Sequence, residues 1–237
     1  MRIPYTGCPL GAIFLSTDKI LAKRLLFNAG LPTPNWWTPE EGPAEAGDSF
    51  FIVKSLWEDA SIGIDDNSVV FGLDSAREKI REKETSFGGK WFAEAYIEGR
   101  EFNVSIVEEP TGPRVLPLAE IRFLDFPEGK PKMVGYRAKW EEESFEYLNT
   151  PRTFSFPQED EPLLKSLSKQ ALAAWKIFGF RGYGRVDFRV GLDGSLYILE
   201  LNCNPCLSPD SGFMAACLQD GMAIEDTVSL ILAAVRR

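Results

Sequence analysis

The strongest constraint in the sequence is a hairpin pattern in its C-terminal part. Two runs in which apolar and polar residues alternate, 185–190 and 196–202, flank the pair Asp193-Gly194. An Asp-Gly pair between alternating runs is a strong short-range signal for a tight β-turn. The sequence therefore predicts two antiparallel strands joined at this pair, and the fold must accommodate that hairpin.

A turn centred on this pair determines which residues lie opposite each other. Asp187 is then opposite Glu200, and Arg185 is opposite Asn202. Side chains along a strand alternate between the two faces of a sheet, so all four of these residues share one face. The other face is expected to be apolar and to carry Val186, Phe188, Val190, Leu199 and Leu201.

Two carboxylates placed opposite each other repel and destabilise a strand pair unless a cation lies between them. Asp187, Glu200 and the amide oxygen of Asn202 are hard oxygen ligands that suit Mg²⁺, with Mn²⁺ as the alternative ion. Mg²⁺ held by few protein groups usually completes its shell with substrate phosphates, and the guanidinium of Arg185 suits a phosphoryl oxygen. The hairpin therefore predicts a metal and phosphate site, and the alternative is a polar face that is only solvated.

Composition limits the chemistry that the chain can perform. Its 237 residues include no histidine, which excludes Ser-His-Asp and Cys-His nucleophile systems and zinc sites built on histidine. Catalysis must rest on carboxylates, lysine, arginine, backbone groups or a metal. The net charge of −9 argues against binding to nucleic acid or to an anionic membrane surface, because both require basic patches.

The cysteines and the apolar segments indicate the compartment. Cys8, Cys203, Cys206 and Cys217 lack the spaced framework of a secreted domain. Cys203 and Cys206 have the Cys-x-x-Cys spacing of a redox motif, but they follow a metal-ligand pattern and do not lead into a thioredoxin-like helix. With no apolar stretch of about 18 residues and no apolar N-terminal segment, the protein is expected to be soluble and cytoplasmic.

Caps and periodicity predict several further elements. Ser16 or Thr17 is expected to cap a helix that runs to Ala29. Residues 49–54 are expected to form a short buried strand that ends in Lys54, whose charge is directed at an anion or at solvent. Three more helices are expected, at residues 163–178, 212–219 and 223–235, the last two covering the sheet.

The hairpin resembles the metal and phosphate signature of ATP-grasp ligases. Arg185-Val-Asp-Phe followed by Leu199-Glu-Leu-Asn-x-Asn-Pro is similar to the motif of the D-alanine–D-alanine ligase branch. The resemblance implies an α+β fold with two lobes, each with an antiparallel sheet and flanking helices. It also implies that Asp187, Glu200 and Asn202 hold two Mg²⁺ ions and that Arg185 contacts the transferred phosphate.

The resemblance also implies how the chain is divided. Residues 17–98 are expected to form the N-terminal lobe, and residues 99–237 the C-terminal lobe with the metal site. Residues 1–16 are expected to be an entry segment, because Ile3-Pro-Tyr-Thr-Gly7 resembles the point where these ligases leave an N-terminal α/β domain. We expect that domain to be absent, so that the chain corresponds to only part of a typical family member.

Other positions match the nucleotide site of the family. The residues matching Lys19, Lys54 and Lys139 reach the nucleotide phosphates. The loop after Lys54 resembles a phosphate-covering loop, in which Ser61 would cradle phosphate and Glu58 would orient the loop or the substrate. The resemblance assigns the adenine and ribose contacts to Glu94, Ala95, Tyr96, Ile97 and Glu101.

These assignments predict an ATP- and Mg²⁺-dependent carboxylate–amine ligase that acts through an acyl-phosphate on a small amino-acid or peptide substrate. The side chains expected to act on the reacting groups are those of Arg185, Lys139, Ser61 and Glu58. The alternatives are ligation to another acceptor, such as a thiol, and an ATP-binding regulatory protein that does not ligate. The expected partner is a second copy of the chain or a separate chain that supplies the N-terminal domain.

Two residues depart from the family near the acceptor. Trp140 stands where the ligases usually have tyrosine, and Cys206 stands where they usually have glycine. We therefore expect the chain alone to bind Mg-ATP without making D-alanyl-D-alanine at an ordinary enzymatic rate.

Overall fold

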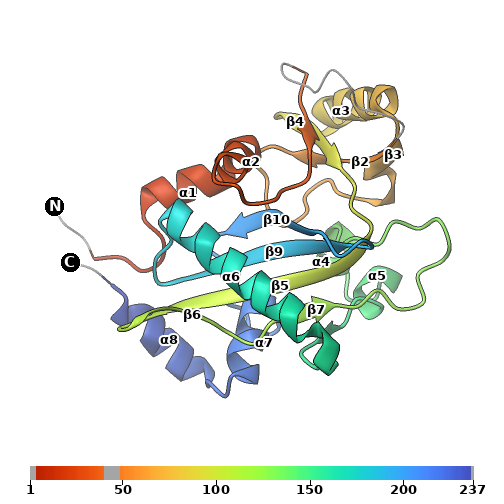
Figure 1. Ribbon diagram of the computed structural model, residues 1–237. Helices are drawn as coiled ribbons and strands as arrows, with labels where there is room; N and C mark the ends of the chain where they lie inside the picture. The colour runs from red at the N-terminus through yellow and green to blue at the C-terminus, as the bar shows by residue number, and fades with distance from the viewer. Residues whose placement is uncertain (1–3, 40–48, 236–237) are drawn as a thin grey trace.

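Two antiparallel sheets with surrounding helices form the framework of the protein (Figure 1). The computed structural model describes residues 4–39 and 49–235. Its helices are α1 (Leu10–Thr17), α2 (Lys19–Asn28), α3 (Leu73–Phe87), α4 (Tyr136–Trp140), α5 (Phe145–Leu148), α6 (Glu161–Phe178), α7 (Gly212–Gln219) and α8 (Ile224–Ala233). Its strands are β1 (Trp36–Trp37), β2 (Phe50–Ser55), β3 (Val69–Phe71), β4 (Trp91–Ala95), β5 (Gly99–Glu109), β6 (Gly112–Val115), β7 (Ala119–Ile121), β8 (Arg152–Thr153), β9 (Tyr183–Gly191) and β10 (Leu196–Asn202).

The two sheets are built from successive parts of the chain. The small sheet has the order β1-β4-β2-β3, and the large sheet has the order β10-β9-β5-β7-β8 with β6 beside β5. All of these pairings are antiparallel. The chain passes from the small to the large sheet between Ala95 and Gly99. The expected α+β class with an antiparallel sheet in each lobe is confirmed, as is the short strand expected at residues 49–54.

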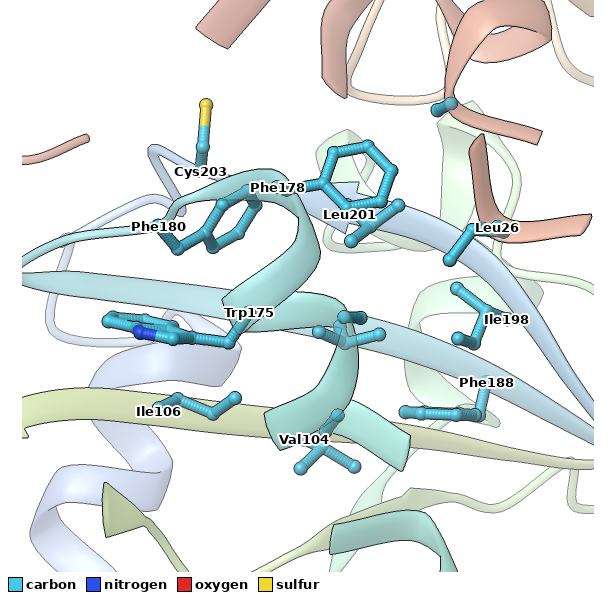
Figure 2. Close-up of a cluster of buried hydrophobic side chains, with 14 of the residues drawn as sticks. Leu26, Val104, Ile106, Trp175, Phe178, Phe180, Phe188, Ile198, Leu201 and Cys203 are labelled. Carbon is cyan, nitrogen blue, oxygen red and sulfur yellow. The ribbon is translucent and has the colours of Figure 1, made fainter. Parts of the chain in front are cut away.

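The main core lies between one face of the large sheet and the helices α1, α2 and α6. Leu26 of α2 is buried in the same cluster as Val104 of β5 and Phe188 of β9. Figure 2 shows Trp175 and Phe178 of α6 among these side chains. The buried positions of α6 follow the helical repeat, as its sequence predicts: Leu167, Ala171, Ala174, Trp175 and Phe178.

The opposite face of the large sheet is divided into an apolar end and a polar half. Val107 and Tyr183 occupy its apolar end and pack against Phe213 of α7 and against α8. This confirms that the two C-terminal helices cover the sheet. Strand residues alternate between the two faces of a sheet, so residues four positions away lie on the same face. There, Asn103 on β5 and Asp187 on β9 are paired and give this face its polar half. The polar half is left facing the small sheet.

The hairpin has the predicted register at the end that carries the acids. Asp187 pairs with Glu200, and Arg185 pairs with Asn202. A β-bulge between Ile198 and Glu200 changes the register toward the turn. The expectation that Leu199 lies on the apolar face is therefore wrong. Ile198 takes the core position, fully buried, and Leu199 turns to the polar side.

The structure has a helix that the sequence did not predict, directly before the helix expected to run to Ala29. Residues 10–17 form α1, and Asp18 starts a new helix by accepting a hydrogen bond from Leu21 N at 2.9 Å. Asp18, and not Ser16 or Thr17, is thus the cap of the helix that carries Lys19. Ile3, the first residue of the expected entry motif, lies outside the described residues. None of the described helices is both long and apolar enough to cross a membrane.

Gly99→Ala is expected to lower the free energy of unfolding by about 3 kcal/mol or more. Gly99 has φ +150°, and a Cβ there would lie 1.9 Å from the carbonyl oxygen of Val190 on the neighbouring strand. Gly129→Ala is the matched control, because Gly129 has φ +78° but no atom within 4 Å of its Cβ position. The control should cost only about 1 kcal/mol for its backbone conformation. Equal losses in chemical denaturation would contradict the steric explanation.

Candidate active site

A cleft of about 720 Å³ lies between the two sheets. Its walls include the polar half of the large sheet, side chains of β2 and β4, and the loop that follows β2. Every site residue predicted from the sequence lines this cleft: Lys19, Lys54, Glu58, Ser61, Glu94, Ala95, Tyr96, Ile97, Glu101, Lys139, Arg185, Asp187, Glu200 and Asn202. The structure therefore brings together residues that are up to 183 positions apart in the chain (202 − 19). Their individual roles stay predictions.

Asp187 is the centre of the polar network on the large sheet. Its carboxylate accepts hydrogen bonds from Asn103 Nδ2 at 2.8 Å and from Asn202 Nδ2 at 2.9 Å. Arg185 approaches the same carboxylate with two nitrogens, Nε at 2.7 Å and Nη2 at 2.8 Å. Burial acts to lower the pKa of Arg185, but the charge and hydrogen bonds of Asp187 hold that pKa above its ordinary value.

Glu200 lies opposite Asp187 and faces a second cation. Lys19 Nζ is 3.7 Å from Glu200 Oε1 and donates a hydrogen bond to the carbonyl oxygen of Glu58 at 2.8 Å. The first residue of α2 thus joins the hairpin to the loop after β2. No group of three or more His, Cys, Asp or Glu side chains that could hold a metal occurs among the described residues. The predicted ligand set has two carboxylates and one amide, Asn202.

Glu94 is enclosed between two lysines. It is 1% exposed, and its carboxylate pairs with Lys54 on the adjacent strand and with Lys23 Nζ at 2.6 Å. Burial acts to raise the pKa of Glu94, but the two lysines hold it below its ordinary value. Burial also lowers the pKa of Lys23, against the attraction of Glu94. Glu94, which the sequence predicts to contact the adenine, thus also forms a buried ion triad with Lys23 and Lys54.

Glu101 is also buried and paired, although it was expected to meet the ribose. Arg189 Nη2 lies 2.8 Å from Glu101 Oε2 and also donates to the carbonyl oxygen of Lys132. Burial raises the pKa of Glu101, and the charge of Asp187 adds to this, while Arg189 opposes it. Arg189 therefore ties the segment before α4 to the large sheet beside the nucleotide positions.

The loop after β2 is held against α4. Ala60 and Ser61 have positive φ angles of 58° and 60°, a conformation that costs energy in residues other than glycine. Trp140 Nε1 donates to the carbonyl oxygen of Ala60 at 3.0 Å, and Ser61 Oγ donates to that of Val134 at 2.9 Å. Trp140, at a position where the resemblance led us to expect a tyrosine, thus links this loop to α4.

Two further cations face the cleft. Lys139 of α4 lines it, and its charge acts to lower the pKa of Glu101. Arg152 donates to the carbonyl oxygen of Asp210 at 3.0 Å, and burial together with the charge of Arg185 lowers its pKa. A Cβ at Gly212 would lie 3.5 Å from Arg152 Nε and 3.8 Å from Arg185 Nη1, so both guanidinium groups converge on the start of α7.

Sequence reasoning missed four of these residues. Asn103 and Arg189 could have been found, because each lies two residues from a predicted site residue on the same strand face. Lys23 lies one helical turn after Lys19, but nothing local shows that it is buried. Arg152 follows a proline in an irregular stretch, where no pattern indicates its position.

Comparison with known proteins identifies the family. Residues 44–233 match the family model described as "D-ala D-ala ligase C-terminus". The chain belongs to the D-alanine–D-alanine ligase family. Members of this family are ATP-dependent ligases that form carbon–nitrogen bonds, in agreement with the expected enzyme class. The D-alanine–D-alanine ligase of Carboxydothermus hydrogenoformans is 31% identical over 98% of this chain and 73% of that protein.

One further similar sequence and one similar structure extend the comparison. The uncharacterized protein y4sG of Sinorhizobium fredii is 28% identical over 99% of this chain and 67% of its own length. The crystal structure of the Bacillus anthracis D-alanine–D-alanine ligase complexed with ATP superimposes with a TM-score of 0.74. The two chains are 22% identical, and the superposition covers 98% of this chain and 70% of the Bacillus anthracis chain. This similarity confirms the expected ATP-grasp fold.

Proposed function

We propose that the protein is an ATP- and Mg²⁺-dependent ligase that joins a carboxylate to an amine through an acyl-phosphate. The observation that carries this proposal is the convergence of Lys54, Lys139 and Arg185 with Asp187 and Glu200 on one cleft. Cations suited to phosphate and oxygen ligands suited to a divalent metal are the two requirements of phosphoryl transfer. The family membership supports the same reaction class.

The residues of the hairpin fit Mg²⁺. Asp187 and Glu200 supply carboxylate oxygens from facing positions, and Asn202 supplies an amide oxygen on the same face. Lys19 and Arg185 neutralise the two carboxylates in the structure, which marks this place as one where positive charge is needed. Mg²⁺, when bound there, would supply positive charge that offsets the negative charge of the ATP phosphates.

The reaction would proceed in two steps. A carboxylate oxygen of the first substrate attacks the γ-phosphorus of ATP, and ADP leaves. Lys54, Lys139 and Arg185 oppose the negative charge on the phosphoryl oxygens during this transfer. The amine of the second substrate then attacks the carbonyl carbon of the acyl-phosphate, and inorganic phosphate leaves. The closed loop with Ser61 and Glu58 would exclude water, which otherwise hydrolyses the acyl-phosphate.

Arg152 favours a substrate that carries a carboxylate. Its guanidinium forms no ion pair within residues 4–39 and 49–235, and it lies beside Arg185 at the start of α7. A free carboxylate of an amino acid or a short peptide would neutralise it. Relatives are named for the ligation of D-alanine, so D-amino acids are the first substrates to examine.

One assay separates this function from its alternatives. Mg-ATP binding is measured by calorimetry, and phosphate release is measured on the same preparation with D- and L-amino acids. The proposed ligase binds Mg-ATP and releases phosphate only with an amino acid. A regulatory protein binds Mg-ATP without such release, and a ligase with a thiol acceptor requires a thiol. Failure to bind Mg-ATP would refute all three.

Lys139→Ala is expected to weaken ATP binding roughly tenfold or more while leaving adenosine binding unchanged, because only the phosphates lose a cationic partner. The charge of Lys139 acts to lower the pKa of Glu101, but that carboxylate keeps its ion pair with Arg189, so the substitution leaves no buried charge unpaired. Lys165→Ala on α6 is the control, since Lys165 is a solvent-facing lysine that pairs with Glu161 on the same helix. Equal losses of ATP and adenosine affinity would indicate a structural role instead.

The lobe limits and the assembly stay proposals. The change of sheet between Ala95 and Gly99 supports a division into residues 17–98 and 99–237. Pairing with a second copy, or with a chain that completes the substrate site, would be visible in the molar mass from light scattering. A cytoplasmic location is proposed from the reaction, because ATP is its substrate.

A further inference from the structure

Two oppositely charged side chains pair across the neighbouring strands β5 and β9, on the cleft face of the large sheet. Glu101 is directly opposite Arg189. The next pair on the same face joins Asn103 to Asp187, roughly 7 Å further along the strands. Gly99, two residues before Glu101, is where β5 begins after the chain leaves the small sheet. Glu101 therefore lies between that crossing and the proposed metal site.

The carboxylate of Glu101 has one oxygen engaged and one available. Arg189 Nη2 lies 2.8 Å from Oε2. Oε1 forms no hydrogen bond within the described residues, and it is not among the fully buried polar atoms that lack a partner there. Since Glu101 lines the cleft, Oε1 is an accessible acceptor on the wall of the proposed nucleotide site. A hydroxyl group is a neutral donor that suits such an oxygen.

Arg189 is held at three further points. Its Nη1 donates to the carbonyl oxygen of Gly99 at 3.1 Å, and its Nη2 also donates to that of Lys132 at 2.9 Å. Its guanidinium carbon lies 5.4 Å from the centre of the Phe123 ring. The side chain is 3% exposed. A planar guanidinium bound at several points has a fixed orientation, so it fixes the orientation of the Glu101 carboxylate as well.

The peptide group of Lys132 connects this pair to another part of the cleft wall. Tyr96, which lies between the two sheets in sequence, also contacts this residue. Its hydroxyl accepts a hydrogen bond from Lys132 N at 2.8 Å and donates one to Lys132 O at 3.1 Å. The two residues that follow Lys132 line the cleft. Arg189 therefore fixes Glu101 relative to a second segment of the site.

We propose that Arg189 is a positioning residue for ribose recognition. It holds Glu101 so that Oε1 accepts a hydrogen bond from a ribose hydroxyl of ATP, and it ties that carboxylate to the peptide of Lys132. Arg189 thus acts through Glu101 and not on the reacting groups. This role rests on the proposed function, the binding of ATP in this cleft, and extends it to the selection of a ribonucleotide over a deoxyribonucleotide.

Calorimetry of the full chain with ATP, 2′-deoxy-ATP and 3′-deoxy-ATP, each with Mg²⁺, tests this role. We expect the unchanged protein to bind ATP roughly tenfold or more tightly than the analogue that lacks the bonded hydroxyl, because the carboxylate loses a charge-assisted hydrogen bond. In Arg189→Lys this preference should fall below about threefold, since an ammonium cannot hold Glu101 and both carbonyl groups as the guanidinium does. The retained positive charge leaves the buried carboxylate with a counter-charge.

Two further variants set the limits of the measurement. Arg100→Lys makes the same change beside Glu101 on β5 and should leave the preference intact. Arg100 pairs with Glu120 at 2.8 Å and with Asp160 at 2.7 Å, and none of these three residues lines the cleft. The double substitution Arg189→Met with Glu101→Leu removes the buried pair together and should abolish the preference while the fold is kept.

Equal weakening of ATP and both analogues in Arg189→Lys, with the preference unchanged, would show a purely structural role and overturn the proposal. An unchanged protein that binds Mg-ATP without preferring it to either analogue would also overturn the proposal, and so would a loss of preference in Arg100→Lys. The proposed ligase would stand in each of these cases. Failure of the unchanged protein to bind Mg-ATP would refute the proposed function, and this role with it.

Discussion

Asp187→Asn is expected to weaken Mg²⁺-dependent ATP binding roughly 100-fold or more, because it removes one of two carboxylates available to the ion. The side-chain shape is kept, and Asn103 and Asn202 can still contact the new amide. Arg185 loses its ionic partner and becomes available to phosphate. Calorimetry with and without Mg²⁺ therefore gives the clearest readout: the enhancement of ATP affinity by Mg²⁺ should disappear, while Mg²⁺-free binding is retained or strengthened.

The control for this substitution comes from the same hairpin. Asp193→Asn makes the same chemical change at the turn, where the carboxylate accepts hydrogen bonds from Ser195 outside the cleft. It should leave the Mg²⁺ enhancement intact, and Glu200→Gln should reduce it as Asp187→Asn does. An unchanged Mg²⁺ enhancement in both cleft variants would contradict the assignment of the hairpin as the metal site.

Glu94→Ala is expected to lower the free energy of unfolding by about 3–5 kcal/mol, because it leaves Lys23 buried without a counter-charge. Lys23 is 2% exposed, and the remaining hydrogen bonds, to Thr33 Oγ1 at 2.9 Å and to the carbonyl oxygen of Pro34, do not neutralise it. The measurement is urea denaturation of the unliganded protein. Lys54, which is more exposed, loses its partner as well.

Two variants test the electrostatic explanation. Glu82→Ala removes a carboxylate of an exposed pair with Lys79 on α3 and should cost less than about 1 kcal/mol. The double substitution Lys23→Met with Glu94→Leu removes the buried charges together and should recover most of the stability lost in Glu94→Ala. If the double variant is as unstable as the single one, lost packing and not an unpaired charge is the cause.

The same triad gives a pH dependence with a definite sign. The folded-state pKa of Glu94 lies below its ordinary value. Its contribution to stability is therefore complete above the pKa of the unfolded chain and is lost as the pH falls through the folded-state pKa. The acid limb of the stability profile should be shallower in the double variant Lys23→Met, Glu94→Leu, which lacks both groups.

The parts of the site that the sequence predicts well are those set by local pattern. Alternation and an Asp-Gly turn determine the strand faces, so the pairing of Asp187 with Glu200 follows from neighbours in the chain. The bulge beside Glu200 depends on remote contacts. Ile198 N donates to the carbonyl oxygen of Pro32 at 2.8 Å, and Thr33 Oγ1 donates to Ile198 O at 2.9 Å. No local pattern could reveal this anchoring.

Lys23 was missed for a similar reason. On a helix, a lysine four residues after Lys19 has the pattern of a solvated charge, and only the packing of β4 against α2 encloses it with Glu94. Arg152 is placed in the cleft by the pairing of β8 with β7, a short contact that no periodicity indicates. Charged groups whose partners are distant in the chain are thus the class of site residue that sequence patterns fail to locate.

The bulge at Leu199 divides the hairpin into two halves that pair in different registers. On the turn side, Leu196 to Ile198 are aligned by the core and, through Pro32 and Thr33, by the segment between α2 and β1. On the cleft side, Glu200 and Asn202 are aligned through β9, whose Asp187 is itself paired with Asn103 of β5. A change in length at the turn alters the first half and is absorbed before it reaches the acids. We therefore expect the spacing of the proposed metal ligands to tolerate insertions and deletions at the hairpin tip.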